Sequence, residues 1–123
     1  MPRIETGQDK EAMRARIDAE TSAAILAGFD YTVDGENLHF SYDSFDQQNF
    51  ADTANACLLQ KSGASGLPES VTWNAYRANG ELVQLALSSD AFLMLYTAGA
   101  LAHKAACMAE GGQRKAALEG GAA

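Results

Sequence analysis

Residues 71–87 read VTWNAYRANGELVQLAL, and this stretch decides the fold. Apolar and polar residues alternate on both sides of Asn79-Gly80, as they do in strands with one buried face. An Asn-Gly pair between two such runs is a strong signal for a tight β-hairpin, because its turn needs positive φ angles. The residues expected on the buried face of this hairpin are Val71, Trp73, Ala75, Val83, Leu85 and Leu87.

A second hairpin unit lies earlier in the chain, at residues 29–42, which read FDYTVDGENLHFSY. The alternation again has a period of two, and Asp34-Gly35 supplies the turn. The residues expected on its buried face are Phe29, Tyr31, Val33, Leu38, Phe40 and Tyr42.

Three helices are predicted around these hairpins. The first runs from Gln8 to Ala27, with Met13, Ile17, Ala24 and Ile25 as its apolar residues, and Gly28 caps its end. The second starts near Ser44, where Ser44 and Gln47 form a capping-box pattern, and ends near Lys61. Its expected apolar residues are Phe50, Ala54, Cys57 and Leu58.

The third helix starts near Ser89, after the cap candidates Ser88, Ser89 and Asp90. Its expected inner side carries Phe92, Leu95, Tyr96 and Ala106, and Gly111-Gly112 is expected to end or break it. The element order is therefore α-β-β-α-β-β-α, an α+β fold in which two antiparallel hairpins pack against three helices. The pattern does not decide whether the hairpins form one sheet or two ribbons.

Chain length predicts a single domain over residues 1–123, with a core at about 9–110 and a frayed or flexible tail at 111–123. The chain has 9 Lys and Arg against 16 Asp and Glu, a net charge of −7. Because nucleic-acid binding requires a basic surface, we expect no nucleic-acid partner.

The apolar stretch at 91–102 is too short to span a bilayer, and the N-terminus is too polar for a signal peptide. A chain with only two cysteines suits a reducing compartment. We therefore expect no membrane partner and a soluble protein made inside the cell.

No catalytic motif is present in the sequence. Residues 63–66 (GASG) are not followed by the Gly-Lys-Ser/Thr of a phosphate loop, and no serine stands in a Gly-x-Ser-x-Gly elbow. We therefore expect no enzyme activity, no catalytic residues, no cofactor and no cofactor-binding residues.

Metal binding is also not expected. His103 and Cys107 share a helix face, and His39 and Cys57 could complete a zinc site, but no Cys-x-x-Cys pair supports one. A buried thiol and a core-edge histidine are the favoured interpretation. The carboxylates near the first hairpin suit turns and helix caps better than a cation site. They are Asp30, Asp34, Glu36, Asp43 and Asp46.

Two residues are candidates for contact with a partner protein. Trp73 shares a strand face with Val71 and Ala75 and is expected in the core, so Tyr76 points to the other face. Exposed aromatic residues favour interfaces. The second candidate is Arg14, on the expected outward face of the first helix.

Several short motifs resemble a small uncharacterised domain family of tailed bacteriophages and prophages. These motifs are Ala27-Gly28-Phe29, a Tyr-x-x-Asp-Gly at residues 31–35, Val71-Thr72-Trp73 with Ala78-Asn79-Gly80, and a helix holding His103-Lys104. The resemblance runs from about Met13 to Met108. Members of that family are associated with tail-fibre and other tail proteins.

The resemblance implies a non-enzymatic virion tail or tail-fibre component, or a tail-fibre assembly factor, that acts by protein–protein contact. The implied partner is a tail or tail-fibre protein, or a second copy of the chain in a homo-oligomer, and a basic partner surface would suit the net charge. The implied location is the virion tail, or the host cytoplasm during assembly. The alternative is a non-structural phage protein that binds and modulates a host protein.

Overall fold

The computed structural model describes residues 7–120, which form an α+β fold with the predicted order of helices and strands. In chain order the elements are α1 (Gly7–Leu26), β1 (Phe29–Val33), β2 (Glu36–Phe40), α2 (Ser44–Lys61), β3 (Ser70–Tyr76), β4 (Leu82–Ser88), α3 (Ser89–Met94), the π-helical segment η1 (Leu95–Leu101) and α4 (Ala102–Gly120). The segments α3, η1 and α4 follow one another without a break and are called the long helix below.

The two hairpins form one antiparallel sheet of order β1-β2-β3-β4, which settles the question that the sequence left open. Within the hairpins the registers follow the predicted faces: Phe29 pairs with Phe40, and Trp73 pairs with Leu85. Between the hairpins, the only register pair is His39 with Tyr76. The sheet is therefore narrow at its centre, between β2 and β3.

An aromatic core joins the sheet to the helices that cover it. Phe50 of α2 is fully buried, and its ring centroid lies 4.6 Å from Trp73 of β3 and 5.6 Å from Phe92 of α3. It also lies 5.5 Å from the ring of Tyr42 and 5.9 Å from that of Phe29. These contacts connect α2, both hairpins and the long helix into one head.

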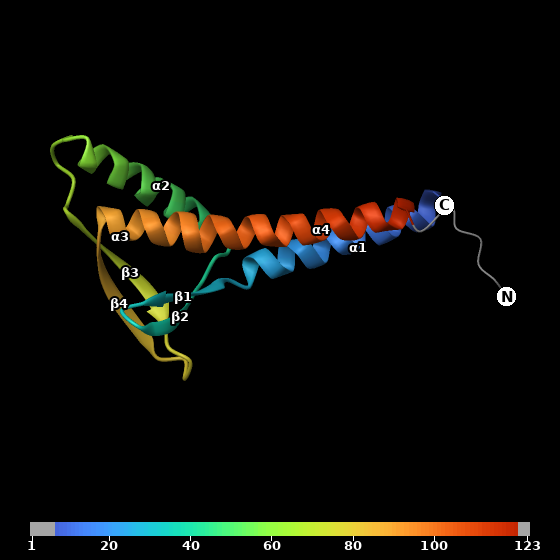
Figure 1. Cartoon of the computed structure of the whole chain (residues 1–123), viewed down its shortest axis with the longest axis horizontal. Helices are drawn as coiled ribbons and strands as arrows, with labels where there is room; N and C mark the ends of the chain where they lie inside the picture. The colour runs from blue at the N-terminus through green and yellow to red at the C-terminus, as the bar shows by residue number, and fades with distance from the viewer. Residues whose placement is uncertain (1–6, 121–123) are drawn as a thin grey trace.

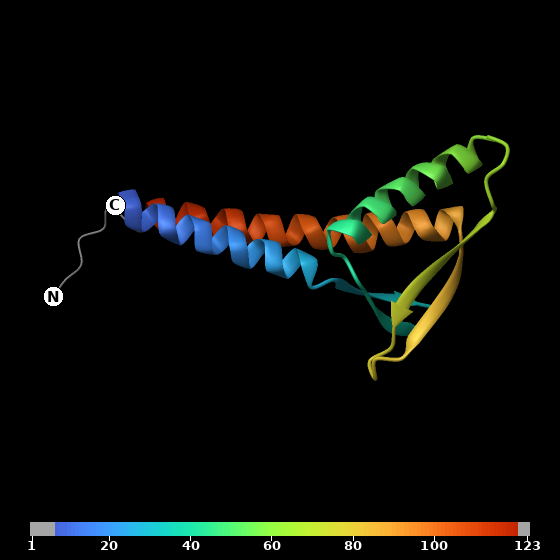
Figure 2. The same cartoon turned by 180° about the vertical axis from the view of Figure 1, so that it is seen from behind.

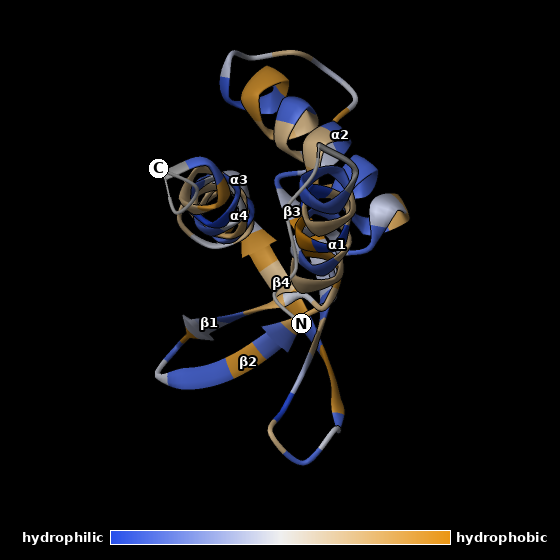
Figure 3. Ribbon diagram, turned by 90° about the vertical axis from the view of Figure 1, so that its right-hand side faces the viewer, coloured by the Kyte–Doolittle hydropathy of each residue, from blue (hydrophilic) through white to orange (hydrophobic). Residues whose placement is uncertain are grey.

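An antiparallel helix pair extends from the head and is called the arm below; it consists of α1 and α4 (Figures 1 and 2). Ion pairs bridge the two helices, at 2.8 Å between Lys115 and Asp18 and at 2.8 Å between Arg114 and Glu20. Viewed along the arm, α3 and α4 overlap, so the long helix is nearly straight (Figure 3). The long helix thus belongs to both parts of the molecule: α3 and η1 pack in the head, and α4 forms half of the arm.

The expected helix end at Gly111-Gly112 is wrong, since α4 continues to Gly120. Gly111 is buried, and a Cβ there would overlap the hydroxyl oxygen of Thr21 on α1. The missing side chain at Gly111 therefore allows α1 and α4 to pack closely. Residues 111–120 of the expected tail are helical, and residues 121–123 lie outside the described residues.

Two further expectations about the helices need correction. The N-cap of α2 is Asp43, one residue before the expected Ser44, and its capping box uses the side chain of Asp46. Four of the apolar residues expected in the core face solvent instead, because the buried side of each helix is narrower than the spacing of its apolar residues predicts. These exposed residues are Met13, Ala24, Leu58 and Ala106.

Gly28 carries a constraint that can be tested by substitution. Its φ of +88° disfavours any side chain, and a Cβ would overlap the Phe40 carbonyl oxygen and lie 2.7 Å from Nε2 of His39. Gly63, at the end of α2, has a φ of +94° but open space around it. We expect Gly63→Ala to lower the free energy of unfolding by about 1–2 kcal/mol through backbone strain alone. Gly28→Ala should cost clearly more in the same urea titration, and equal losses would contradict the close approach.

Gly111 and Gly112 provide a second matched pair. Alanine favours a helix over glycine by about 1 kcal/mol, and a Cβ at Gly112 would meet no atom within 4 Å. We expect Gly112→Ala to raise the thermal unfolding midpoint and Gly111→Ala to lower it, because the new methyl group pushes Thr21 and α1 away. If both substitutions raised the midpoint equally, the packing of α1 on Gly111 would be disproved.

Candidate interaction surface

Tyr76 lies where the sequence analysis expected it, on the solvent side of β3 with 36% of its surface exposed. It borders a shallow groove of about 650 Å³ between the start of α2 and the outer side of β3. Phe45, the most exposed large apolar residue at 75%, lines the same groove. The sequence analysis did not select Phe45, although it lies in the first turn of α2 away from the buried stripe of Phe50, Ala54 and Cys57.

Arg14 lies at the junction of the arm helices. Its guanidinium donates a hydrogen bond to Glu119 of α4, and Lys10 lies 3.4 Å from the same carboxylate. Arg14 therefore takes part in the packing of α1 on α4, and its expected contact with a partner stays a prediction.

The histidine and cysteine residues make contacts that hold elements together. Nε2 of His103 donates to the Ile25 carbonyl oxygen at 3.1 Å, and its Nδ1 lies 3.8 Å from Sγ of Cys107. Nδ1 of His39 lies 2.9 Å from Oδ1 of Asp30, and Nε2 of His39 lies 3.0 Å from the Ala27 carbonyl oxygen. Cys57 is buried in α2. Over residues 7–120, no group of three or more histidine, cysteine, aspartate and glutamate side chains could hold a metal ion.

Four of the five charged side chains of α4 contact its neighbouring helices, and the fifth, Glu110, is exposed. Arg114, Lys115 and Glu119 form ion pairs with α1, and Lys104 donates to Gln47 of α2 at 3.0 Å. The hydrogen bond from Arg114 lowers the pKa of Glu20, and those from Arg14 and Lys10 lower the pKa of Glu119. The ion pairs of Glu20 and Glu119 are therefore present at neutral pH and are lost as the pH falls through the lowered pKa values of these two carboxyl groups.

The side of α4 turned away from these neighbours is exposed and carries no charge. We call it the outer face, and it consists of Leu101, at the end of η1, and Ala102, Ala105, Met108, Ala109, Gly112, Gln113 and Ala116. All eight residues are exposed, including Met108 at 57% and Leu101 at 40%. Exposed apolar surface of this length is typical of an interface.

Among the described residues, one helix is long and apolar enough to cross a membrane, judged by length and composition alone: Ser89–Glu119, within the long helix. Only 22% of its most apolar 18-residue stretch is buried in the fold. The core helix of a compact domain would be mostly buried. This helix therefore exposes apolar surface that its own fold does not cover.

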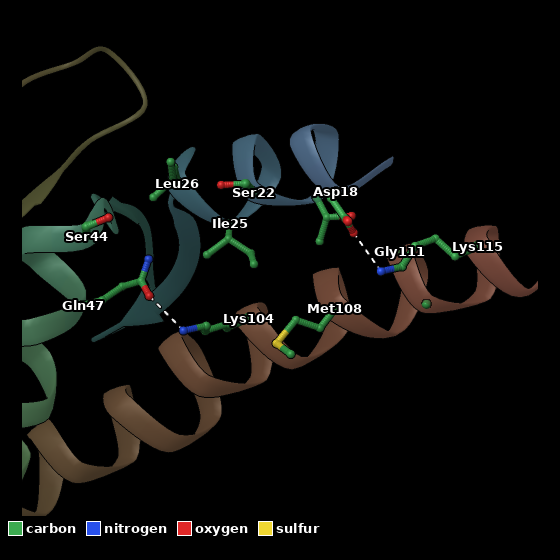
Figure 4. A pocket seen from close by; sticks show the side chains of 12 residues that line it. Asp18, Ser22, Ile25, Leu26, Ser44, Gln47, Lys104, Met108, Gly111 and Lys115 are labelled. Atoms are coloured by element: carbon green, nitrogen blue, oxygen red, sulfur yellow. Dashed lines mark hydrogen bonds and ion pairs between the residues drawn. The ribbon is translucent and has the colours of Figure 1, made fainter. Parts of the chain in front are cut away.

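A groove of about 450 Å³ borders the outer face where the arm meets the head (Figure 4). Ile25 and Leu26 of α1, Gln47 of α2, and Lys104 and Met108 of α4 are among its lining residues. Leu26 is 41% exposed, so the groove adds apolar surface beside Met108. The sequence analysis missed this region, because the alanine and methionine residues of α4 carry no motif.

Comparison with known proteins gives one family match. No curated protein matches the chain significantly. No solved structure does so either. Residues 8–123 match the family described as a domain of unknown function, DUF4376, and since this match covers most of the sequence, the chain belongs to that family.

Proposed function

We propose that this chain is a non-enzymatic bacteriophage tail-associated protein, a virion tail or tail-fibre component or assembly factor, that acts by protein–protein contact. The outer face of the long helix is the observation that supports contact as its mode of action. It leaves Leu101 and Met108 in water, and burial of each of these apolar side chains would be favourable. The tail setting rests on the motif resemblance described in the sequence analysis.

A protein surface suits the outer face better than a lipid surface does. Helices that lie on membranes carry large apolar residues on one face and many lysine and arginine residues on the other. Four of the eight outer-face residues are alanine, and one leucine and one methionine are its large apolar residues, so it offers little area to acyl chains. The net charge of −7 also opposes binding to anionic lipids. Small side chains instead permit another helix to approach closely.

Quantitative peptide mass spectrometry of purified phage particles tests the tail setting. We expect the chain at a fixed, integral copy number relative to the major tail protein in particles from the phage or prophage that encodes it. An abundant cytoplasmic host protein in the same sample gives the level of carry-over. Presence in the lysate but not in particles would instead indicate an assembly factor or a host-directed protein.

A pull-down from the same lysate then separates the last two possibilities. The tagged chain should recover a tail or tail-fibre protein, and Phe45→Glu in the groove beside Tyr76 should reduce that recovery. Ala51→Glu, at an exposed position of α2 that does not line this groove, introduces the same charge and should leave recovery unchanged. Recovery of a host protein alone would contradict the tail assignment.

A further inference from the structure

We propose that the outer face of the long helix binds the outer face of a second copy of this chain, so that the protein is a homo-oligomer joined by its long helices. This inference rests on the proposal that the chain acts by protein–protein contact, but it does not require the phage setting. Four properties of the outer face support it: its charge, its spacing, its width and the thin packing of the arm.

The absence of charge on the outer face favours a partner face that is also uncharged. The chain carries 16 acidic and 9 basic residues. A basic partner would therefore bind the acidic surfaces of the protein, outside the uncharged outer face. Between Leu101 and Ala116 the outer face presents only apolar side chains and the amide of Gln113. Two copies can therefore meet there without like-charge contact, which their net charges would cause at other surfaces.

The spacing of the outer face matches the repeat by which helices pack along one another. From the start of α4 onward, Leu101 and Met108 are seven residues apart, and Ala105 and Gly112 follow each of them by four. The same steps then reach Lys115 and Glu119, which form ion pairs with α1, so the seam runs from Leu101 to Gly112. Alternating steps of four and three residues form the apolar seam of a coiled coil. A copy of the same helix presents the same repeat, so the two seams match along their length. Glycine and alanine at alternate positions let the backbones come close.

The width of the outer face leaves room for more than one neighbour. With 3.6 residues per turn, the outer-face residues of α4 span an arc of about 140°, wider than the stripe of a strict two-stranded coiled coil. Each long helix can therefore contact two others. A closed ring of like copies uses such a face fully and leaves no open end.

Within a single chain, the two arm helices bury few side chains against each other. Ile17 and Gly111 are buried at the middle of the arm, but no residue among 9–16 and 112–119, toward its tip, is buried, and Met13 stays 41% exposed. Helices held by so few contacts are marginal in water, because most helical stability in proteins comes from tertiary packing. The ion pairs between α1 and α4 are solvent-exposed and contribute little. Packing of the outer faces would supply the missing burial.

The molar mass of the purified chain in solution tests the proposal. Light scattering after gel filtration, at total concentrations from about 1 to 100 μM, should give a multiple of 13.0 kDa. Ala105→Glu should raise the dissociation constant by at least about tenfold and shift the mass toward one copy, because the new carboxylates face one another. Ala51→Glu adds the same charge to an exposed position of α2 and should keep the mass of the unchanged chain.

Circular dichroism of the same samples separates dissociation from unfolding. Ala105→Glu should retain its helical signal at concentrations where it is one copy, since residue 105 is exposed in the single chain. A mass of 13.0 kDa for the unchanged chain at every concentration would overturn the proposal. So would an oligomer that Ala105→Glu leaves intact, since another surface would then hold the copies together. Neither result would bear on whether phage particles contain the chain.

Discussion

The contacts of Phe50 are the interaction on which the head depends. Its ring lies against Trp73 of one hairpin, against Phe29 and Tyr42 at the other, and against Phe92 of the long helix. Among the described residues, one register pair, His39 with Tyr76, and an exposed ion pair at 2.9 Å between Arg77 and Glu36 link the hairpins, so the sheet alone would join them weakly. The side chain of Phe50, rather than the hydrogen-bond ladder, therefore fixes the angle between the two halves of the sheet.

The long helix connects the packed head to the arm. Phe92 and Leu95 are buried in the head, and η1 allows the sheet to approach closely, since a Cβ at Gly99 would lie 2.8 Å from the ring of Phe29. Beyond η1 the same helix continues as α4 and supports α1. Gly28 then turns the chain from α1 into β1 against the Phe40 carbonyl group. The arm is thus held to the head at two points, one on each of its helices.

Local sequence signals predicted the elements well because strands and turns depend on near neighbours. The period-two alternation and the Asp34-Gly35 turn identified the faces of the first hairpin, and the end of α2 at Lys61 was correct. The arm could not be predicted in this way. Gly111 breaks a helix by propensity, and only the distant Thr21 shows that it marks a close approach. The outer face likewise depends on where α1 and the sheet lie, which the alanines of α4 do not reveal.

The antiparallel arrangement of the arm also sets how far the head stands from the tip where α1 begins and α4 ends. α1 begins and α4 ends at the same tip, and a helix of 20 residues such as α1 is about 30 Å long (Figure 1). Because each step along α1 is matched by one along α4, equal insertions in both helices would lengthen this spacer without altering the head. Insertions of seven residues would also preserve which side of each helix faces the other. The distance from the tip of the arm to the head can therefore change through insertions in α1 and α4 while the fold of the head stays the same.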